Sequence, residues 1–213
     1  MKAAVTGRYM PKIVDEQMRE ATRRKILREA AREFARLGFD QANINLIAEQ
    51  AGIGKGTIYL YFENKRELFL AMLRTIAQTQ LGTVRAALAE AGTLEQRLAR
   101  LFLAFARLAE EDSDSFSVYM SALYGVNRAF QAEATRLLRD YLAVISLVLE
   151  QGQANGEIQS NDIEASSLLV LSLTESYILS ARVLDWPETE ITNRAEAIAH
   201  TIIQGLAPKP TVT

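Results

Sequence analysis

Cysteine is absent from this chain of 213 residues, and histidine occurs once, as His200. A chain without cysteine has no disulfide framework and no thiolate metal site. No cluster of His, Asp and Glu has the spacing of a metal site either. We therefore expect no metal and no other cofactor, and we interpret His200 as an interface or surface residue.

Proline is scarce, with four residues, and no Asn-Gly or Asp-Gly turn separates alternating apolar runs as in a β-hairpin. Ala, Leu, Glu and Arg dominate the composition and favour helix over strand. No stretch of about 18 uncharged apolar residues is present, as a membrane span would need. The N-terminal region lacks the apolar segment of a signal peptide. We therefore expect a soluble, cytoplasmic, helical protein that makes no membrane contact.

The formal net charge of −2 by itself argues against nucleic-acid binding, but the two signs are unevenly distributed. Residues 1–76 carry 14 Lys and Arg against 9 Asp and Glu, whereas residues 77–213 carry 10 against 17. A basic N-terminal part followed by an acidic C-terminal part is typical of a DNA-binding domain joined to a sensor domain. Chance fluctuation in a mixed-charge surface is the alternative explanation.

Helix caps and apolar periodicity predict an all-α fold of about nine helices without a sheet. The expected helices span about residues 22–38, 44–51, 55–62, 64–90, 93–110, 113–125, 127–154, 162–187 and 187–205. The expected N-caps are Asn43, Asn64, Thr93 and Asp162. In this arrangement a three-helix N-terminal domain precedes a larger helical domain.

Residues 43–65 predict a helix-turn-helix, in which two short helices are joined by a tight turn. Gly52 allows the positive φ that such a turn requires, and the small side chains of Ala48 and Ala51 allow close approach of the helices. The core between them is expected to contain Leu46, Ile47, Ile53 and Ile58. Because the major groove admits a helix, we expect the second short helix to bind there.

Side chains on and near the second short helix are of types that can contact DNA phosphates and base edges. Lys55 can contact a phosphate or a guanine edge, Thr57 and Tyr59 can donate to phosphate oxygens, and Gly56 lets the backbone approach the DNA. Lys65 offers its ammonium and the first amides of the next helix to a phosphate. The expected DNA-binding residues are Arg23, Arg24, Asn43, Asn45, Lys55, Gly56, Thr57, Tyr59, Leu60, Tyr61 and Lys65.

This region resembles the N-terminal signature of the TetR (tetracycline-repressor-like) family of transcriptional regulators. The resemblance covers about residues 22–70 and is carried by Ile26-Leu27, Ala30-Ala31, Phe34, Gly38-Phe39, Ile47-Ala48, Ala51-Gly52-Ile53, Lys55-Gly56-Thr57-Ile58-Tyr59, Tyr61-Phe62 and Asn64-Lys65. Two positions depart from the family pattern: Gly54 stands where Ser is frequent, and Tyr61 where His is frequent. The operator sequence therefore cannot be transferred from relatives.

The resemblance implies a helix-turn-helix domain at 22–68, a helical effector-binding and dimerisation domain at 69–207, and a tail at 208–213. Residues 1–21 are expected to be a separate N-terminal segment, either a loosely packed leader or a basic arm for the minor groove. The family forms homodimers mainly through its last two helices. The expected interface residues are Leu168, Leu171, Ile178, Val183, Ile191, Ala195, Ile198 and Ile202.

Aromatic residues gather in the expected effector domain, where a mainly apolar cavity with a few polar groups would suit a small molecule. The expected pocket residues are Phe102, Phe105, Phe116, Tyr119, Met120, Tyr124, Tyr141, Glu175 and Tyr177. Each aromatic residue could equally be ordinary core. Glu175 is a charge in an apolar helix, and it would face either a cationic ligand or an arginine such as Arg182 or Arg107.

The leading hypothesis is a ligand-responsive homodimeric repressor that binds a palindromic double-stranded DNA operator, with recognition helices about 34–36 Å apart. A small, largely apolar effector would favour a dimer with lower DNA affinity. The main alternative is a TetR-like DNA-binding protein without a small-molecule effector.

Two enzymatic interpretations are weaker, so we expect no enzyme. The acidic run at 110–114 suggests an all-helical Mg²⁺-dependent enzyme, but a second metal-binding cluster is missing. The run Gly52–Thr57 loosely resembles a phosphate-binding P-loop. Glu49 and Gly56, however, occupy the positions where that motif needs Gly and Ser or Thr.

Overall fold

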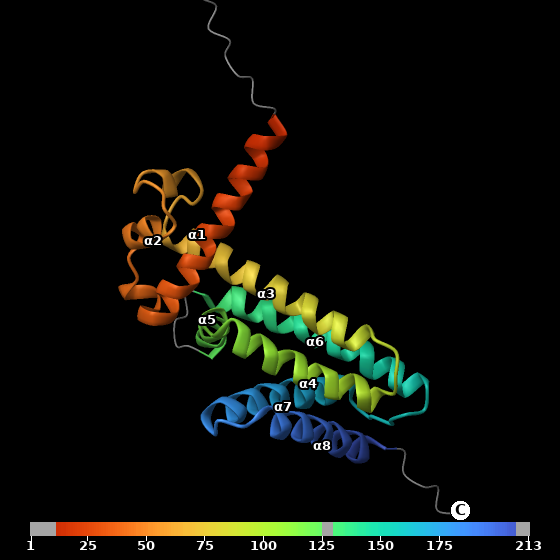
Figure 1. Ribbon diagram of the computed structural model, residues 1–213. Helices are drawn as coiled ribbons and strands as arrows, with labels where there is room; N and C mark the ends of the chain where they lie inside the picture. Colours follow the sequence, from red (N-terminus) through yellow and green to blue (C-terminus); the bar gives the residue numbers. More distant parts are fainter. Residues whose placement is uncertain (1–11, 125–129, 208–213) are drawn as a thin grey trace, which may run out of the picture. The chain divides into compact units, whose positions relative to one another are not determined.

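Helices alone make up the secondary structure of the part of the chain that the computed structural model describes, residues 12–124 and 130–207 (Figure 1). These residues contain eight α-helices and one short 3-10 helix, without a strand, which confirms the predicted all-α class. The chain divides between Leu73 and Arg74 into two compact units, called the first and the second unit below.

The first unit holds α1 (Lys12–Gln41), α2 (Ile44–Gln50), the 3-10 helix η1 (Thr57–Leu60) and the beginning of α3 (Lys65–Ala89). Its core is apolar and includes an edge-on contact between Phe34 and Phe69, whose ring centres are 4.9 Å apart. The other fully buried side chains of this core include Ile26, Ala30, Ile47, Ala48, Ile58 and Leu68. This core holds the turn between α2 and η1 against α1.

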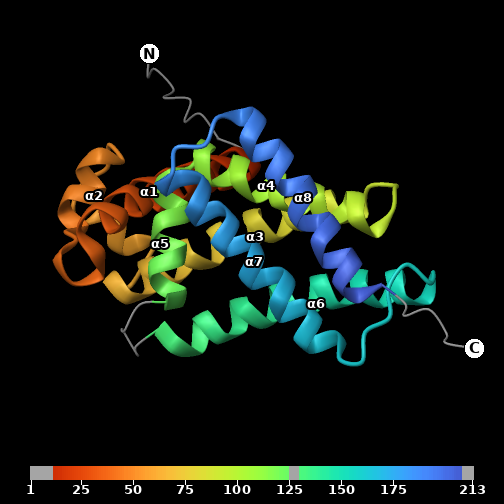
Figure 2. The same cartoon turned by 90° about the horizontal axis from the view of Figure 1, so that it is seen from below.

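The second unit holds the rest of α3, together with α4 (Leu94–Glu111), α5 (Ser113–Tyr124), α6 (Gln131–Ala154), α7 (Ile163–Val183) and α8 (Glu188–Leu206). Helix α4 contacts α5, α6, α7 and α8, while α6 also lies against α5 and α7. Figure 2 shows α7 and α8 side by side near α4. Helix α4 is therefore the central helix of this unit.

The sequence explains why α4 forms and why it is central. Thr93 and Gln96 form a capping box at its beginning, in which each side chain accepts a hydrogen bond from the backbone amide of the other residue. Apolar residues recur at helical spacing along one face, which is buried. That face comprises Leu94, Leu98, Leu101, Phe102, Phe105 and Ala109.

Most of the expected helix ends are confirmed. Asn43 accepts a hydrogen bond from Asn45 N at 2.9 Å, and Asp162 accepts one from Ala165 N at 2.9 Å. Asn64 accepts one from Glu67 N at 2.9 Å. Gly38 interrupts α1 with a φ of 71°, and a last helical turn continues to Gln41. These caps satisfy amides that would otherwise lack partners within the helices.

Helix α1 begins at Lys12, ten residues before the expected start, so the expected separate segment at 1–21 is wrong for residues 12–21. The side chains from Asp15 to Ala21 are exposed. Because this part of the helix buries no face, its sequence lacks the apolar periodicity from which a helix is predicted. The segment lacks Gly and Pro, so the helix continues through it. Residues 1–11, which include the basic Lys2 and Arg8, lie outside the described residues.

The helix expected at 55–62 is a 3-10 helix of four residues, Thr57–Leu60. Gly54 and Gly56 disfavour regular helix on its N-terminal side. On its C-terminal side, Asn64 already caps α3, so only three residues separate η1 from that cap. Two later helices also differ from expectation: α7 ends at Val183 rather than 187, and α6 begins at Gln131 rather than 127. The expected end of α5 at Gly125 lies outside the described residues.

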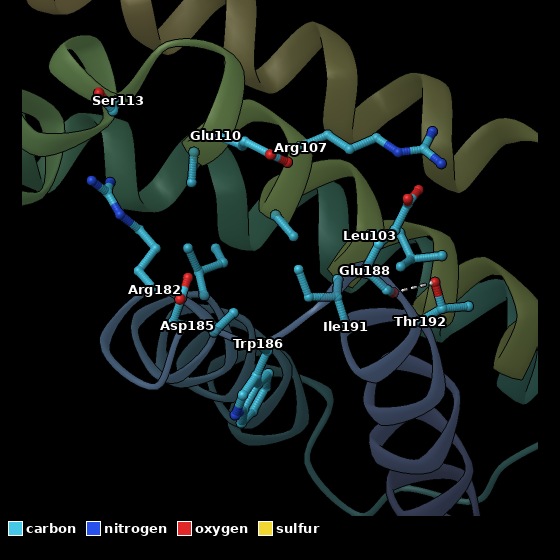
Figure 3. Close-up of a pocket in the computed structure, with 14 residues that line it drawn as sticks. Leu103, Arg107, Glu110, Ser113, Arg182, Asp185, Trp186, Glu188, Ile191 and Thr192 are labelled. Atoms are coloured by element: carbon cyan, nitrogen blue, oxygen red, sulfur yellow. Dashed lines mark hydrogen bonds between the residues drawn. The ribbon is translucent and has the colours of Figure 1, made fainter.

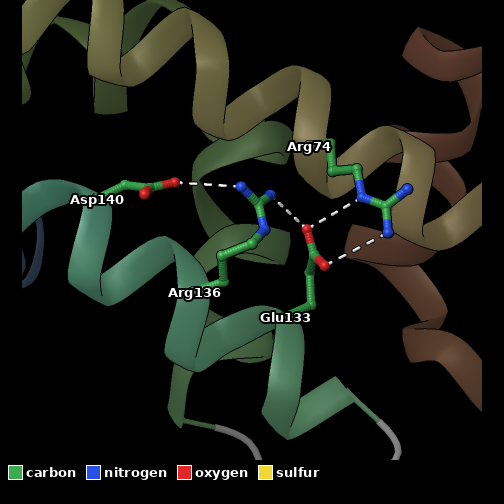
Figure 4. Close-up of polar contacts among 4 residues, drawn as sticks. All are labelled: Arg74, Glu133, Arg136 and Asp140. Atoms are coloured by element: carbon green, nitrogen blue, oxygen red, sulfur yellow. Dashed lines mark hydrogen bonds and ion pairs between the residues drawn. The ribbon is translucent and has the colours of Figure 1, made fainter.

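An ion-pair cluster joins α3 to α6 inside the second unit (Figure 4). The carboxylate of Glu133 accepts hydrogen bonds from Arg74 at 3.1 Å and from Arg136 at 2.6 Å, and Arg136 also donates to Asp140 at 3.2 Å. Burial acts to raise the pKa of Glu133. The hydrogen bonds and charges of Arg136 and Arg74 outweigh it, so the pKa lies below the ordinary 4.5.

We expect Glu133→Gln to lower the free energy of unfolding by about 1 kcal/mol at neutral pH, because two arginines lose their carboxylate partner. A lowered pKa stabilises the fold above the ordinary pKa of the carboxyl group, and this contribution is lost as the pH falls through the lowered value. The difference between wild type and variant in urea unfolding should therefore shrink below a pH of about 4.5.

Glu90→Gln is a matched control, because Glu90 pairs with Arg100 on the surface with 65% of its side chain exposed, against 11% for Glu133. Its effect on the free energy of unfolding should be close to zero. Equal losses in the two variants would contradict a stabilising role for the Glu133 cluster.

Candidate functional site

The turn between α2 and η1 depends on Gly52, whose φ of 68° confirms the predicted left-handed conformation. Gly52 N donates to Glu49 O at 2.9 Å, and Ile53 N donates to Ala48 O at 3.0 Å, so the chain reverses within a few residues. A side chain here would be strained by this φ, and its Cβ would lie 3.2 Å from Lys25 Nζ.

A buried carboxylate fixes the beginning of α2. Glu33 is almost fully buried, pairs with Arg36 at 2.8 Å and accepts a hydrogen bond from Asn43 N at 3.2 Å. Asn43 in turn caps α2 through the amide of Asn45. The side chains of Asn43 and Asn45 are exposed, so their contact with DNA stays a prediction while their structural role is visible.

Helix η1 presents one face to solvent and the other to the core. Tyr59 is 50% exposed and Leu60 is 75% exposed, whereas Ile58 is buried. Of the other expected residues, Lys55 and Gly56 are exposed, and Thr57 and Tyr61 are half-buried. An exposed Leu beside a Tyr and a Lys is suited to contact with thymine methyl groups and phosphates.

Three consecutive cationic residues of α1, Arg23, Arg24 and Lys25, belong to the same unit. The guanidinium of Arg23 lies over the ring of Phe62, 5.5 Å from its centre, and Arg24 is 3.9 Å from the carboxylate of Glu20. Lys25 points its ammonium toward Gly52 in the turn. Lys25 was not among the residues expected at the DNA, although it is exposed and directly follows Arg23 and Arg24 in α1.

Lys65 has structural partners within the first unit. Its ammonium donates to the carbonyl oxygen of Asp40 at 2.8 Å and lies 5.1 Å from the ring centre of Phe39. These contacts tie the beginning of α3 to the end of α1. One of the three ammonium donors is thereby used, and a phosphate contact would draw on the remaining two.

Helices α4, α5, α6 and α7 enclose a small cavity of about 10 Å³ in the second unit. Six of the nine residues expected at the effector site line it: Phe105, Phe116, Tyr119, Met120, Tyr141 and Glu175. Leu171 and Ile178 complete the wall. We call this space the inner cavity. Its volume is close to that of one water molecule, so its walls are nearly in contact.

Phe102 and Tyr177, which were also expected at the pocket, do not line this cavity. Phe102 is fully buried and packs edge-on against Tyr177, with ring centres 5.5 Å apart. The hydroxyl of Tyr177 donates to Ile191 O at 2.7 Å, and burial raises the pKa of Tyr177 to about 12. Both side chains are core between α4, α7 and α8. The side chain of Tyr124 lies outside the described residues.

Three residues with polar groups, Tyr119, Tyr141 and Glu175, also line the inner cavity. The hydroxyl of Tyr141 donates to Gln80 Oε1 at 3.0 Å, and both side chains are buried. Burial and the charge of Glu175 raise the pKa of Tyr141 well above its ordinary value, against the smaller opposing effect of a hydrogen bond with Tyr119. Tyr141 therefore keeps its proton at neutral pH and can donate its hydrogen bond to Gln80.

A larger cleft of about 510 Å³ lies between α4, α7 and α8 and reaches the first residue of α5, Ser113 (Figure 3). We call it the outer cleft. It is lined by the charged residues Arg107, Glu110, Arg182, Asp185 and Glu188, beside Trp186, Ile178 and Ile191. Arg107 and Arg182, considered as partners of Glu175, thus belong to this cleft.

Four of the eight residues expected at the dimer interface are core in this structure: Leu171, Ile178, Ala195 and Ile202 are buried within the second unit. Their burial comes from contacts within the chain, while Ile202 also lines an apolar groove between α7 and α8, so their part in a dimer interface stays a prediction. Val183 is 72% exposed, Leu168 is exposed, and Ile191 and Ile198 are half-buried. Further exposed apolar residues missed from the sequence are Leu147, Leu169, Leu179 and Leu184.

No group of three or more His, Asp or Glu that could hold a metal ion occurs in the described ranges, and no helix there is long and apolar enough to cross a membrane. The exposed ring of His200 lies 3.2 Å from the carboxylate of Glu95.

Comparison with known proteins identifies two family models in the chain. Residues 26–72 match "Bacterial regulatory proteins, tetR family", and residues 91–178 match "Tetracyclin repressor-like, C-terminal domain". The HTH-type transcriptional regulator YhgD of Bacillus subtilis is 26% identical over 178 residues, which are 83% of this chain and 91% of that protein. The matched relatives are transcriptional regulators rather than enzymes, in agreement with the expected class.

Two further relatives concern fatty acids. The fatty acid metabolism regulator protein of Bacillus subtilis is 22% identical over 186 residues, which are 87% of this chain and 95% of that protein. The crystal structure of the regulator FadR from Bacillus subtilis in complex with stearoyl-CoA superposes with a TM-score of 0.75 at 21% identity. The superposition covers 86% of this chain and 98% of that chain, so the two share a fold.

We expect Lys55→Ala to weaken binding to a DNA fragment that the wild type selects from random sequence. Because one phosphate contact is lost, the slope of the logarithm of affinity against the logarithm of salt concentration should fall by about one. Arg85→Ala, an exposed change on α3 in the second unit, is the control and should leave the slope unchanged. An unchanged slope for Lys55→Ala would contradict a phosphate contact by this residue.

Proposed function

Because this chain belongs to the TetR family of DNA-binding transcriptional regulators, we propose that it is a homodimeric repressor released from its operator by a fatty acyl-CoA. The first unit carries the helix-turn-helix that binds operator DNA. In the proposal, the acyl chain occupies the inner cavity of the second unit and lowers the affinity of the dimer for the operator.

The observation that carries the proposal is the inner cavity itself. Its wall combines Phe105, Phe116, Met120, Leu171 and Ile178 with three residues that carry polar groups, and all of these residues come from the helices of the effector-binding unit. Apolar walls with few polar groups are typical of small-molecule sites. The relatives named for fatty acid metabolism, and the fold shared with a regulator bound to stearoyl-CoA, support an acyl chain as the occupant.

A cavity of about 10 Å³ must open to admit an acyl chain. The flexible thioether of Met120 and the rings of Phe105 and Phe116 are the groups that would move, and methionine adapts readily to new packing. The described conformation would then be the effector-empty state. An effector that binds only the opened state shifts the population toward it, by no more than its difference in affinity for the two states.

The proposed dimer interface is the exposed apolar face of α7 and α8. Leu168, Leu179 and Val183 lie on it, and serines 172, 176 and 180 on the same helix keep it slim for close packing. A groove of about 480 Å³ beside it is lined mostly by apolar residues, among them Leu169, Leu173 and Ile198. Side chains of a second copy would cover these groups from water.

A second candidate function is a TetR-family regulator that acts without a small-molecule effector. The small volume of the inner cavity favours it, because a filled core needs no ligand. Titration of the operator complex with stearoyl-CoA distinguishes the two functions. Release of the DNA supports an acyl effector, and an intact complex at saturating stearoyl-CoA supports the second candidate.

We expect Met120→Trp to abolish release of the operator by stearoyl-CoA while operator affinity is retained, because the larger ring fills the space that the acyl chain needs. The change should weaken acyl-CoA binding by at least about tenfold, which corresponds to about 1.4 kcal/mol. Ala86→Trp, at an exposed position of α3, is the control for an added indole. A full response of Met120→Trp to stearoyl-CoA would exclude the inner cavity as the acyl site.

We expect Leu179→Arg to convert the dimer into monomers, because the 62% exposed Leu179 would place a charge in an apolar interface. Sedimentation at micromolar concentration measures the change, and operator affinity should fall with it because two half-sites are no longer bound together. Gln78→Arg, at an exposed position of α3, should leave the dimer intact. A dimeric Leu179→Arg protein would place the interface elsewhere.

A further inference from the structure

The inner cavity and the outer cleft share a wall. Ile178 lines both spaces, and the guanidinium of Arg182, a residue of the outer cleft, lies over the ring of Phe116, a residue of the inner cavity. The distance from the guanidinium carbon to the ring centre is 5.7 Å. Arg182 and Phe116 therefore stand where a path between the two spaces would pass.

The charged side chains of the outer cleft lack ion-pair partners. Arg107, Glu110, Arg182, Asp185 and Glu188 line one space, yet none of them takes part in an ion pair with any residue in the described ranges. In Figure 3 the guanidinium groups of Arg107 and Arg182 lie toward opposite ends of the cleft. Charged groups held around one cleft without pairing remain available to a ligand.

The backbone at this cleft is also strained. Asp185, in the loop between α7 and α8, has a φ of 50°, the one positive φ of a non-glycine residue in the described ranges. The next residue, Trp186, donates from its backbone to Ala181 O at 3.0 Å. Together these features hold Asp185 and Trp186 on the cleft wall, and such strain is frequent at binding sites.

We propose that the outer cleft binds the anionic head group of the effector and that Arg182 is its anchor, with Phe116 closing the path by which the acyl chain reaches the inner cavity. The inference deepens the proposed function and rests on it. The ligand class is an acyl chain that carries an anionic head group, either the carboxylate of a fatty acid or the phosphates of coenzyme A.

The charges of the two spaces determine the orientation of the ligand. The walls of the inner cavity are mainly aromatic and apolar, and the acidic Glu175 is the charged residue among the eight that line it, so these walls offer no cation to an anionic head group. Arg182 and Arg107 are the cations lining the outer cleft. The head group therefore stays outside, against Arg182, and the apolar chain points inward.

The carboxylates of the outer cleft restrict the positions at which an anionic group can bind there. Three acidic residues and two arginines line the cleft, so an anionic group is stabilised only where it lies closer to an arginine than to a carboxylate. The cleft therefore selects ligands by the position of their anionic group relative to their acyl chain. A compact anion without a chain would gain little.

The only tryptophan of the chain, Trp186, lines both the outer cleft and the apolar groove beside α8, so its fluorescence is read together with calorimetry. Wild type, Arg182→Gln and Arg182→Lys are titrated with stearoyl-CoA, stearate and coenzyme A alone, with tryptophan fluorescence and calorimetry as readouts. We expect Arg182→Gln to weaken binding of the anionic acyl ligand about tenfold at low salt, the effect of one lost charge-assisted contact. Arg182→Lys should restore most of the affinity, and high salt should reduce the difference.

Arg85→Gln, an exposed charge removal on α3, controls for net charge and should leave binding unchanged. Dependence of stearate binding on Arg182 identifies a carboxylate head group, and dependence confined to stearoyl-CoA identifies the coenzyme A phosphates; both support the inference. Unchanged binding by Arg182→Gln, or binding of coenzyme A alone as tight as that of stearoyl-CoA, overturns it while the proposed function stands. Failure of the wild type to bind any acyl ligand overturns both.

Discussion

The apolar face of α4 is the contact on which the second unit depends. Leu98, Leu101, Phe102 and Phe105 on this face are buried where α4 meets α6, α7 and α8. Burying each such side chain contributes about 1.5–3 kcal/mol relative to exposure, so this helix contributes a large share of the stability. Both spaces of the unit use α4 as a wall, and its packing therefore sets the boundaries within which a ligand can bind.

In the first unit the corresponding constraint is the tight reversal of the chain at Gly52. The reversal is held by a positive φ, by the buried carboxylate of Glu33 and by the cap at Asn43. These groups stabilise the reversal, while Tyr59 and Leu60 remain exposed on η1, where we expect them to contact DNA. Few polar side chains remain for base edges, so dimer spacing and DNA shape would carry much of the specificity.

The two spaces of the second unit differ in the chemistry that they offer. The inner cavity is small and lined mainly by aromatic and apolar side chains, whereas the outer cleft is large and carries charges without ion-pair partners in the described ranges, and Arg182 stacks on Phe116 between the two. An amphipathic ligand matches this division because its two parts need different surroundings. Helix α3, which begins in the first unit and ends in the second, is the chain element common to both.

Local signals in the sequence determined the helical class, the caps at Asn43, Asn64, Thr93 and Asp162, and the turn at Gly52, because each depends on residues a few positions apart. The clustering of aromatic residues also pointed to four residues of the inner cavity, Phe105, Phe116, Tyr119 and Tyr141, with Met120 and Glu175 beside them. Only the tertiary structure decided that Phe102 and Tyr177 are core, that Leu171 and Ile178 face inward, and that Arg182 stacks on Phe116. Such facts depend on which face of a helix meets a neighbour distant in sequence, and an evenly apolar helix such as α7 carries no periodic signal for it.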